Sequence, residues 1–280
     1  MSIIDFVQSH ETEIRLSVFV GVLAAMIGLE TVFERKKRVE PRLLRWATNL
    51  GIVVIYTIVL RLIFPVAAMG TAVYAQAHGY GLLNLVALPI WGHILLSAVV
   101  LDLAVYFQHI ASHKVGIFWK FHQVHHADRD IDATTGIRFH PVEIVLSMLY
   151  KMLVVLALGP HVVGVFIFEV VLNGSAMFNH ANIRLPLWLD KIVRTVFVTP
   201  DMHRVHHSIY REETDSNYGF NLSIWDRIFR TYIPNPKDGH EKMVIGLPMY
   251  QDHKPSNLVW CLALPFHRKT NENLKKEPLS

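Results

Sequence analysis

The sequence is poor in cysteine and in charge. Of its 280 residues one is a cysteine, Cys261, which excludes an internal disulfide framework and a metal cluster built on cysteine. Charged side chains make up 18% of the chain, whereas 52% is hydrophobic and the mean hydropathy is +0.31. The apolar residues gather in long runs that a soluble core does not need. We therefore expect an all-α membrane protein.

Nucleic-acid binding and several metal motifs are also excluded. The net charge is +4 and the isoelectric point is near 9.1, but no basic stripe interleaves with aromatic residues, so we expect no nucleic-acid partner. The chain has no C-x-x-C, no H-E-x-x-H of a zinc protease and no E-x-x-H of the kind that ferritin-like carboxylate bundles use. Any metal site must therefore be built from other patterns.

Four to five runs are long and apolar enough to cross a bilayer, which takes about 20 residues per helix. The last two runs meet at Gly159-Pro160, a pair that predicts the tip of a helical hairpin. Residues 81–89 are too short to span alone, and we expect them along the membrane interface. The five expected spans are roughly 14–33, 46–69, 88–110, 142–158 and 161–179.

Positive charge is distributed unevenly around these runs. The stretch 34–45 holds six Lys or Arg, whereas residues 67–90 hold none. Because loops rich in Lys and Arg stay on the cytoplasmic side, we expect the N-terminus outside and the end of the third span inside. Residues 111–140 and 180–265 then form a cytoplasmic helical cap.

The two ends of the chain carry weaker signals. Asp5, Glu11 and Glu13 precede the first apolar run, unlike the basic start of a cleaved signal peptide, so we treat the N-terminus as mature protein. We expect a flexible polar tail at 268–280. Residues 1–280 are interpreted as one membrane domain.

Four polar side chains interrupt the apolar runs, namely Arg61, Asp102, Lys151 and Glu169. In lipid each should face the bundle interior or a partner. Lys151 and Glu169 stand at similar distances from the hairpin tip. We therefore predict that these two side chains pair.

Histidine is the abundant reactive residue, with 17 copies, of which eight fall into three tight groups. Two groups share the pattern H-x-x-H-H, and positions i, i+3 and i+4 of a helix project to one side. Two imidazoles at i and i+4 are a common chelating pair. The remaining solitary histidines receive no role. The three groups are His109 and His113; His122, His125 and His126; and His203, His206 and His207.

So many imidazoles exceed what one ion can use, so the sequence predicts two metal ions. Imidazole suits zinc, iron, copper and nickel, and ligand type alone leaves the metal open. The groups lie at the ends of expected spans and in the cap, whereas a metal transporter would carry ligands near the bilayer midplane. A lipid could reach such a site, and two irons that activate O₂ would suit it.

These motifs resemble the fatty acid hydroxylase and sterol desaturase superfamily of membrane di-iron oxygenases, closest to its bacterial sterol-desaturase-like branch. The similarity covers about residues 100–230 through "TGIRFHPVE", "FNHANIRLP", "TPDMHRVHHS" and "TDSNYGFNLSIWDRIFRTY". It implies two nonheme irons, O₂ as cosubstrate and electrons from an external donor. The chain lacks the H-P-G-G of a fused cytochrome b5 domain and a G-x-G-x-x-G, so the donor should be a separate cytochrome b5-like protein, ferredoxin or reductase.

The resemblance also implies the ligand set. His180 matches a later lone histidine of the family, and His140 in "RFHP" is a further ligand candidate. Some hydroxylases of the family carry a second H-x3-H near His180, but here the stretch reads "HANIR". The expected metal ligands are His109, His113, His122, His125, His126, His180, His203, His206 and His207.

Several other residues are candidates for supporting roles. Asp102 lies on the same helical face as His109, so it is expected to hydrogen-bond an imidazole and fix its tautomer. Thr199 and Pro200 predict the start of the helix that carries His203. The weaker candidates near the metals are Asn182, Asn217 and Tyr218, and we expect Phe220, Ile224 and Phe229 to pack within the cap.

The sequence therefore predicts a multi-pass enzyme, placed in a bacterial inner membrane with its active site on the cytoplasmic face, that hydroxylates a C–H bond of a lipid. Desaturation of a lipid or sterol by the same site is the alternative within this class. A hydrolase or lyase with two zinc ions and a non-catalytic metal-binding or transport protein are the alternatives of other classes.

Overall fold

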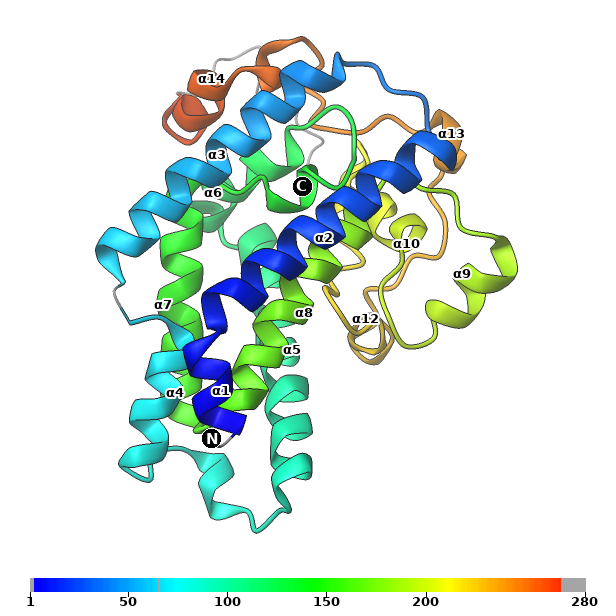
Figure 1. Cartoon of the computed structure of the whole chain (residues 1–280). Coiled ribbons are helices and arrows are strands. Elements are labelled where there is room, and N and C mark those ends of the chain that lie inside the picture. Colours follow the sequence, from blue (N-terminus) through cyan, green and yellow to red (C-terminus); the bar gives the residue numbers. More distant parts are fainter. Residues whose placement is uncertain (1–2, 65, 268–280) are drawn as a thin grey trace.

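The computed structural model describes residues 3–64 and 66–267, and the regular structure in this part of the chain is helical, without a β-strand (Figure 1). The expected all-α class is confirmed. The tail expected at 268–280 lies outside the described residues.

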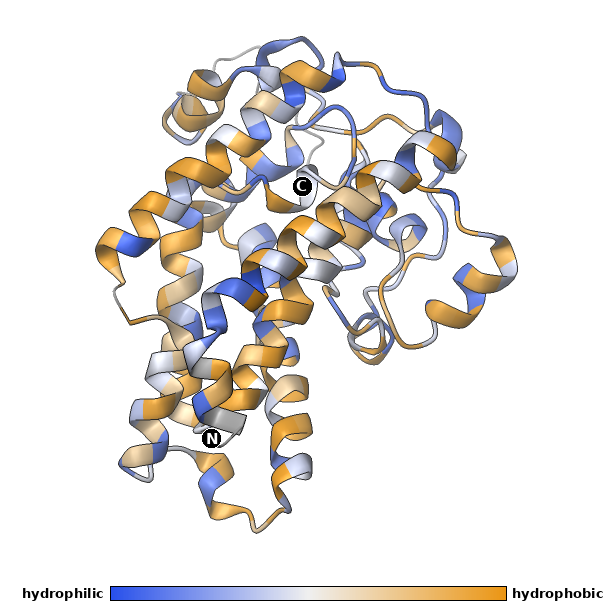
Figure 2. Cartoon of the chain, viewed as in Figure 1, coloured by the Kyte–Doolittle hydropathy of each residue, from blue (hydrophilic) through white to orange (hydrophobic). Residues whose placement is uncertain are grey.

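Five long helices form the framework, and each is apolar and long enough to cross a membrane (Figure 2). The chain is therefore an integral membrane protein with the five helices that the sequence predicts. These helices are α2 (Glu11–Val32), α3 (Arg42–Ile63), α5 (Ile90–Lys114), α7 (Pro141–Leu158) and α8 (Val162–His180).

Short helices and turns make up the rest of the described chain. The α-helical pieces are α1 (Ile3–Ser9), α4 (Ala68–Ala77), α6 (Gly116–His126), α9 (Leu187–Val193), α10 (Pro200–His206), α11 (Arg211–Thr214), α12 (Ile224–Ile228), α13 (Gly239–Lys242) and α14 (Leu258–Ala263). The 3-10 turns are Leu82–Leu85, Thr135–Ile137, Lys254–Ser256 and Leu264–Phe266.

The predicted boundary of the second span is wrong. We expected one helix over 46–69, but α3 ends at Ile63 and a separate helix, α4, begins at Ala68. Phe64 has left the helical region, with φ −119° and ψ 80°. A proline follows it in the sequence, and the residue before a proline avoids helical geometry.

Helix α8 is central to the bundle and packs against α5 and α2. Leu101, Val155, Val165 and Phe168 bury their side chains where α5, α7 and α8 meet. The contact is close because Gly164 faces Ser97, where a Cβ would lie 2.6 Å from the serine Cβ. The bundle therefore holds the end of α8, and His180 with it, in a fixed place.

The hairpin between α7 and α8 turns where the sequence predicts. Gly159 caps α7 in the left-handed region at φ +60°. Gly81 packs directly against this turn, since a Cβ on Gly81 would lie 2.1 Å from the Gly159 backbone nitrogen. The loops around 81 and 159 thus meet at one end of the molecule (Figure 1).

The predicted pair in the spans is confirmed. Lys151 Nζ lies 2.7 Å from Glu169 Oε1, and Arg15 Nη2, from α2, lies 2.7 Å from the other carboxylate oxygen. Arg61 differs from the prediction, because its side chain is exposed in the last turn of α3. A long cationic side chain at a helix end can reach the interface from there.

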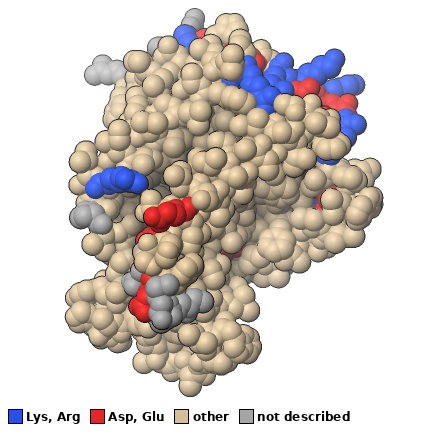
Figure 3. Space-filling model, in the orientation of Figure 1, with Lys and Arg blue, Asp and Glu red and all other residues tan. Residues whose placement is uncertain are grey.

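The cap consists of α6, the loop that follows it and α9–α14, and it covers the ends of α5 and α8 (Figure 1). Arg45 ties it to α3: Nη2 lies 2.7 Å from Asp128 Oδ2 and Nη1 lies 2.6 Å from Asp132 Oδ2. Lys and Arg gather on the surface at the end of the molecule where α2 leads toward α3, whereas the helices below are largely uncharged (Figure 3).

The expected packing of the 220–229 segment is confirmed in part. Phe220 lies with its ring centroid 5.0 Å from that of His109, whereas Phe229 is 42% exposed and stacks on Tyr106 of α5 at 5.4 Å. Ile224 is 45% exposed and does not pack inside the cap, because α12 turns this side outward.

Candidate metal centre

The ends of four helices converge to bring the nine predicted histidines together. None of these side chains is more than 4% exposed. Helix α5 contributes His109 and His113 in its last turns, α6 contributes three histidines, and His180 is the last residue of α8. Helix α10 contributes His203 and His206, and His207 follows as the C-cap residue of this helix.

The start of α10 follows the sequence prediction. The Thr199 hydroxyl accepts a hydrogen bond from the Met202 backbone N–H at 3.3 Å, and Pro200 occupies the first turn. Asp201 sits at the same end, as expected for a carboxylate near a helix N-terminus. These contacts fix where the helix begins, and so which way its three histidines point.

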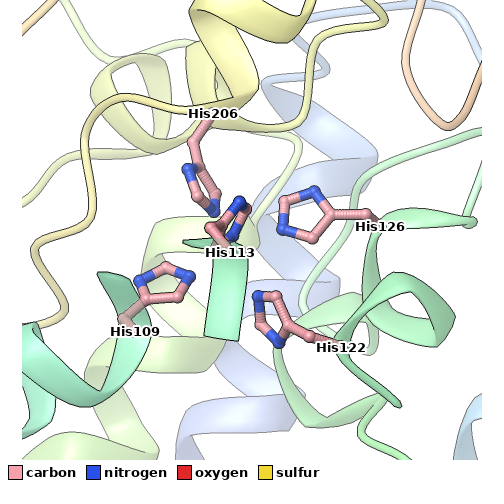
Figure 4. Close-up of side chains that lie close together, drawn as sticks. All are labelled: His109, His113, His122, His126 and His206. Carbon is pink, nitrogen blue, oxygen red and sulfur yellow. The ribbon is translucent and has the colours of Figure 1, made fainter. Parts of the chain in front are cut away.

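The nine imidazoles form two groups, within each of which one nitrogen per ring lies within 4.8 Å of every other. Metal–imidazole bonds of about 2 Å place opposite ligands of one ion roughly 4 Å apart, so both groups have the size of a metal site. Site 1 is His109, His113, His122, His126 and His206 (Figure 4). Site 2 is His125, His180, His203 and His207.

Each H-x-x-H-H motif is divided between the two sites. In the α6 motif, His122 and His126 point to site 1 and His125 points to site 2. In the α10 motif the arrangement is reversed, with His206 in site 1 and its two partners in site 2. Consecutive histidines therefore serve neighbouring sites, and the rings of His126 and His207 lie 4.6 Å apart.

Hydrogen bonds orient the rings of site 1. The Nδ1–H of His109 donates to the Tyr218 carbonyl and that of His206 to the Ser216 carbonyl, both at 2.7 Å. His122 Nδ1 lies 2.6 Å from Glu143 Oε1. Within the described residues, the Nε2 atoms of these three histidines are buried without a hydrogen-bond partner. With Nδ1 protonated, each Nε2 presents a lone pair to the centre of the site.

Site 2 places three ring nitrogens against one another. His180 Nδ1 donates to the Ala176 carbonyl at 2.6 Å, which leaves Nε2 as an acceptor. His125 Nε2 and His203 Nε2 approach that atom at 3.1 and 3.0 Å. One lone pair does not satisfy two donors well, whereas a cation bound by all three nitrogens satisfies each of them. The donor set of both sites thus fits a metal ion.

The surroundings keep the cap imidazoles neutral. Burial lowers the pKa of His125, His126, His203 and His207 well below the ordinary value, and the neighbouring imidazoles lower it further. Burial also lowers the pKa of His206, to about 3. A neutral imidazole has the lone pair that a metal needs, so the rings are ready to bind at physiological pH.

Three supporting residues bond elsewhere than predicted. The Asp102 carboxylate accepts hydrogen bonds from Trp225 Nε1 at 2.7 Å and from Asn221 Nδ2 at 2.9 Å, so it holds the segment before and within α12 rather than an imidazole. Two turns of α5 separate it from His109. Asn182 donates to the Lys36 carbonyl and fixes a loop, whereas Asn217 donates to the Met202 and Ile233 carbonyls and ties α10 to the segment after α12.

Two other candidates are placed clearly. Tyr218 contacts the site through its backbone carbonyl, which holds His109, and its ring lies 5.2 Å from that of His113. His140 lies outside both sites: it caps α7, where Nδ1 accepts from the Val142 N–H at 3.2 Å. The proline after it starts a helix there, and the imidazole is used as the cap.

Sequence reasoning missed Glu143, which is the carboxylate bound to His122. It also missed Phe139, whose ring stacks on His125 with centroids 4.5 Å apart. Both lie in the quoted stretch "TGIRFHPVE", but no spacing rule relates them to histidines of α6.

Comparison with known proteins agrees with this geometry. The fatty acid hydroxylase family model matches residues 94–231, a segment that contains all nine histidines of sites 1 and 2. This segment belongs to the fatty acid hydroxylase family. The predicted resemblance is therefore confirmed. Glu143 and Phe139, which the sequence did not reveal, also lie within the hydroxylase segment.

Curated relatives cover parts of the chain. It is 32% identical over 173 residues to human alkylglycerol monooxygenase, which is 59% of this chain and 34% of that protein. It is 26% identical over 194 residues to the ornithine lipid hydroxylase OlsE of Rhizobium tropici, which is 68% of this chain and 55% of that protein. The chain thus spans about a third to a half of the length of these relatives. No solved structure matches significantly.

Proposed function

We propose that the protein is a membrane-bound nonheme di-iron oxygenase that hydroxylates a C–H bond of a lipid with O₂ and external electrons. The observation that carries the proposal is the division of nine buried histidines into two adjacent groups. In site 1 the Nε2 atoms of His109, His122, His126 and His206 have no partner among the described residues, and in site 2 three Nε2 atoms lie against one another. Membership of the hydroxylase family and the names of the relatives support the lipid and the monooxygenase reaction.

Iron is proposed because imidazole ligands alone fit several metals and the relatives are named for oxygenation. Five histidines of site 1 and four of site 2 would hold one ion each. When bound, the two irons would supply O₂ reduction and oxidation of the C–H bond. Overall, R–H, O₂, two electrons and two protons give R–OH and water.

Residues of the chain itself orient the imidazoles of this centre and exclude water from it. Backbone carbonyls and Glu143 fix the rings so that the free nitrogens converge. The rings of Phe139 and Phe220 lie against His125 and His109 and keep water from that side. An enzyme that holds its reacting groups rigid and excludes water gains rate through orientation.

We place the protein in a bacterial inner membrane, with the cap and both sites on the cytoplasmic side. The concentration of Lys and Arg at the end where α2 leads toward α3 supports this orientation (Figure 3). The same basic surface would attract an acidic electron donor, such as a cytochrome b5-like protein, a ferredoxin or a reductase.

The test is metal analysis of the purified protein together with lipid mass spectrometry under ¹⁸O₂. We expect about two irons per chain and a lipid that gains one labelled oxygen. Loss of two hydrogens without oxygen would indicate the desaturase. Bound zinc with turnover that needs no O₂ would contradict the oxygenase.

A further inference from the structure

A lateral pocket lies next to site 1, between α5, α6 and α7. Its volume is about 310 Å³. Phe107, Phe118 and Leu146 line it and are themselves 37–45% exposed on the outer surface of these helices, so the pocket opens sideways toward the lipid. A molecule could enter it from the bilayer without crossing the cap.

The two ends of the lateral pocket differ in polarity. Helix α5 reaches the cap at its last residue and α7 leaves it at its first, so Ser112 and Glu143 lie at the cap end. Tyr150 is two turns further along α7, about 10 Å deeper. The pocket thus has a polar end beside the histidines and a remainder that is mostly apolar, interrupted by Ser147 and Tyr150, of the kind that suits a lipid tail.

The polar end is rich in hydrogen-bond acceptors. Glu143 Oε1 is bound to His122, whereas Oε2 is buried and has no partner among the described residues. Ser112 uses its hydroxyl hydrogen on the Gln108 carbonyl at 3.1 Å, which leaves its oxygen as an acceptor. The Gln108 side-chain oxygen is also buried and unpaired in this part of the structure. Buried acceptors of this kind favour a ligand that donates.

We propose that the lateral pocket binds the head-group end of a lipid that carries a hydroxyl or amide N–H. That donor bonds to Glu143 Oε2 while the same carboxylate holds His122. The oxidised carbon therefore lies near the polar head of the lipid rather than in the middle of its chain. The position of the oxidised carbon rests on the proposed oxygenase function, whereas the binding of the lipid does not.

The binding test uses metal-free protein in lipid nanodiscs and two photoreactive probes. One is hexadecanol with a diazirine in the chain, and the other is its methyl ether, which accepts but does not donate. We expect the alcohol to label α5 and α7 at least about tenfold more strongly than the ether does. One hydrogen bond to a charged acceptor accounts for a ratio of at least this size. Equal labelling by both probes, or labelling confined to helices other than α5, α6 and α7, would overturn the proposal.

Substitution of the acceptor sharpens the test. Glu143→Gln keeps the shape and can still accept from His122, but it turns an amide NH₂ toward the pocket. The preference should then move toward the methyl ether. Gln108→Leu removes a second acceptor and should weaken labelling by the alcohol more than labelling by the ether, whereas Gln76→Leu, exposed on α4, should leave labelling by both probes unchanged. An unchanged alcohol preference in Glu143→Gln would overturn the role of this carboxylate.

Oxidation is read separately, from the position of ¹⁸O in the product lipid. Oxygen near the head group supports the inference, and oxygen in mid-chain overturns it while leaving the oxygenase intact. Hydroxyl-dependent labelling without any turnover under O₂ would instead overturn the proposed function and leave the pocket assignment standing.

Discussion

Glu143 holds His122 across the boundary between membrane helix and cap, with Oε1 of the first 2.6 Å from Nδ1 of the second. The carboxylate belongs to the first turn of α7 and the imidazole to α6. Because Nδ1 is engaged, Nε2 faces site 1. Carboxylates that orient metal-binding histidines raise the basicity of the ring and fix its tautomer. This bond therefore links the position of α7 to the orientation of a histidine in site 1.

Glu143→Gln tests this bond. A neutral amide holds the ring N–H more weakly than a carboxylate does, so we expect iron affinity or turnover to fall by about 10–100-fold. Circular dichroism should show unchanged helix content. Glu212→Gln, an exposed acid on α11, is the matched control and should keep full activity. Wild-type iron affinity and turnover in Glu143→Gln would contradict the assignment.

Substitution of neighbouring histidines tests the division of the motifs. His206→Ala removes a histidine from site 1, and His207→Ala removes one from site 2. We expect both to abolish lipid oxidation and each to release iron from a different site, measured as iron per chain and by Mössbauer spectroscopy. His78→Ala, at an exposed position directly after α4, should behave as wild type. Retained turnover in His206→Ala, or the same spectrum for both variants, would refute the division.

The histidines could be predicted from the sequence because i, i+3 and i+4 spacing is a local property of a helix. The division of these histidines between sites 1 and 2 could not be predicted from the sequence. Whether His125 or His126 joins site 1 depends on how α6 crosses α5 and α10, which is a property of the tertiary packing. Glu143 was missed for the same reason, since 21 residues separate it from His122.

Two other differences from the prediction also come from contacts between residues far apart in the sequence. Asp102 shares a face of α5 with His109, but the indole N–H of Trp225 and the amide of Asn221 take its carboxylate first. Arg15 was overlooked as a partner of Glu169 because 154 residues separate them. Hydropathy found all five long helices, since burial in lipid needs long apolar runs, but it did not see the break after α3.

The ion network around Glu169 should show an asymmetric response. Glu169→Gln leaves Lys151 without its anion and Arg15 with Glu11 alone, whereas Lys151→Met leaves Glu169 paired with Arg15. We expect the first to lower the free energy of unfolding by on the order of 3–5 kcal/mol and the second by less. The double variant should cost less than the sum, measured by denaturation in detergent micelles. Strict additivity would contradict the network.

We expect Arg45 to stabilise the attachment of the cap by about as much as Glu169 stabilises the bundle. Its side chain is fully buried and bonds to Asp128 and Asp132, and although burial opposes it, Arg45 lowers the pKa of Asp128 to about 2. Arg45→Met leaves two buried carboxylates unpaired and should cost on the order of 3–5 kcal/mol.

Arg45→Lys keeps the charge without the two-pronged geometry, so its loss should be intermediate. Thermal unfolding in micelles is the measurement. Arg61→Met, exposed on the same helix, is the control and should change little. Equal stability of Arg45→Met and Arg61→Met would show that the buried arginine does not hold the cap.

His240 makes a pH-dependent contribution to the stability of the fold. This contribution can be measured separately from that of the histidines in sites 1 and 2. His240 is buried on α13, where burial lowers its pKa to about 4; Asp201 opposes this shift, and Arg204, Arg35 and Arg194 add to it. The unfolded chain, with the ordinary pKa of about 6.5, therefore binds a proton more readily than the folded one does. Protonation of this residue thus destabilises the fold between about pH 6.5 and pH 4.

His240→Gln removes this proton binding. Above about pH 7 the variant and the wild type should differ little in pH slope, whereas below about pH 6.5 the wild type should lose stability faster, by up to about 1.4 kcal/mol per pH unit. Both are compared as metal-free protein, so that the histidines of sites 1 and 2 contribute equally. Parallel stability curves from pH 7 to pH 4 would show that His240 is protonated alike in the folded and unfolded chains.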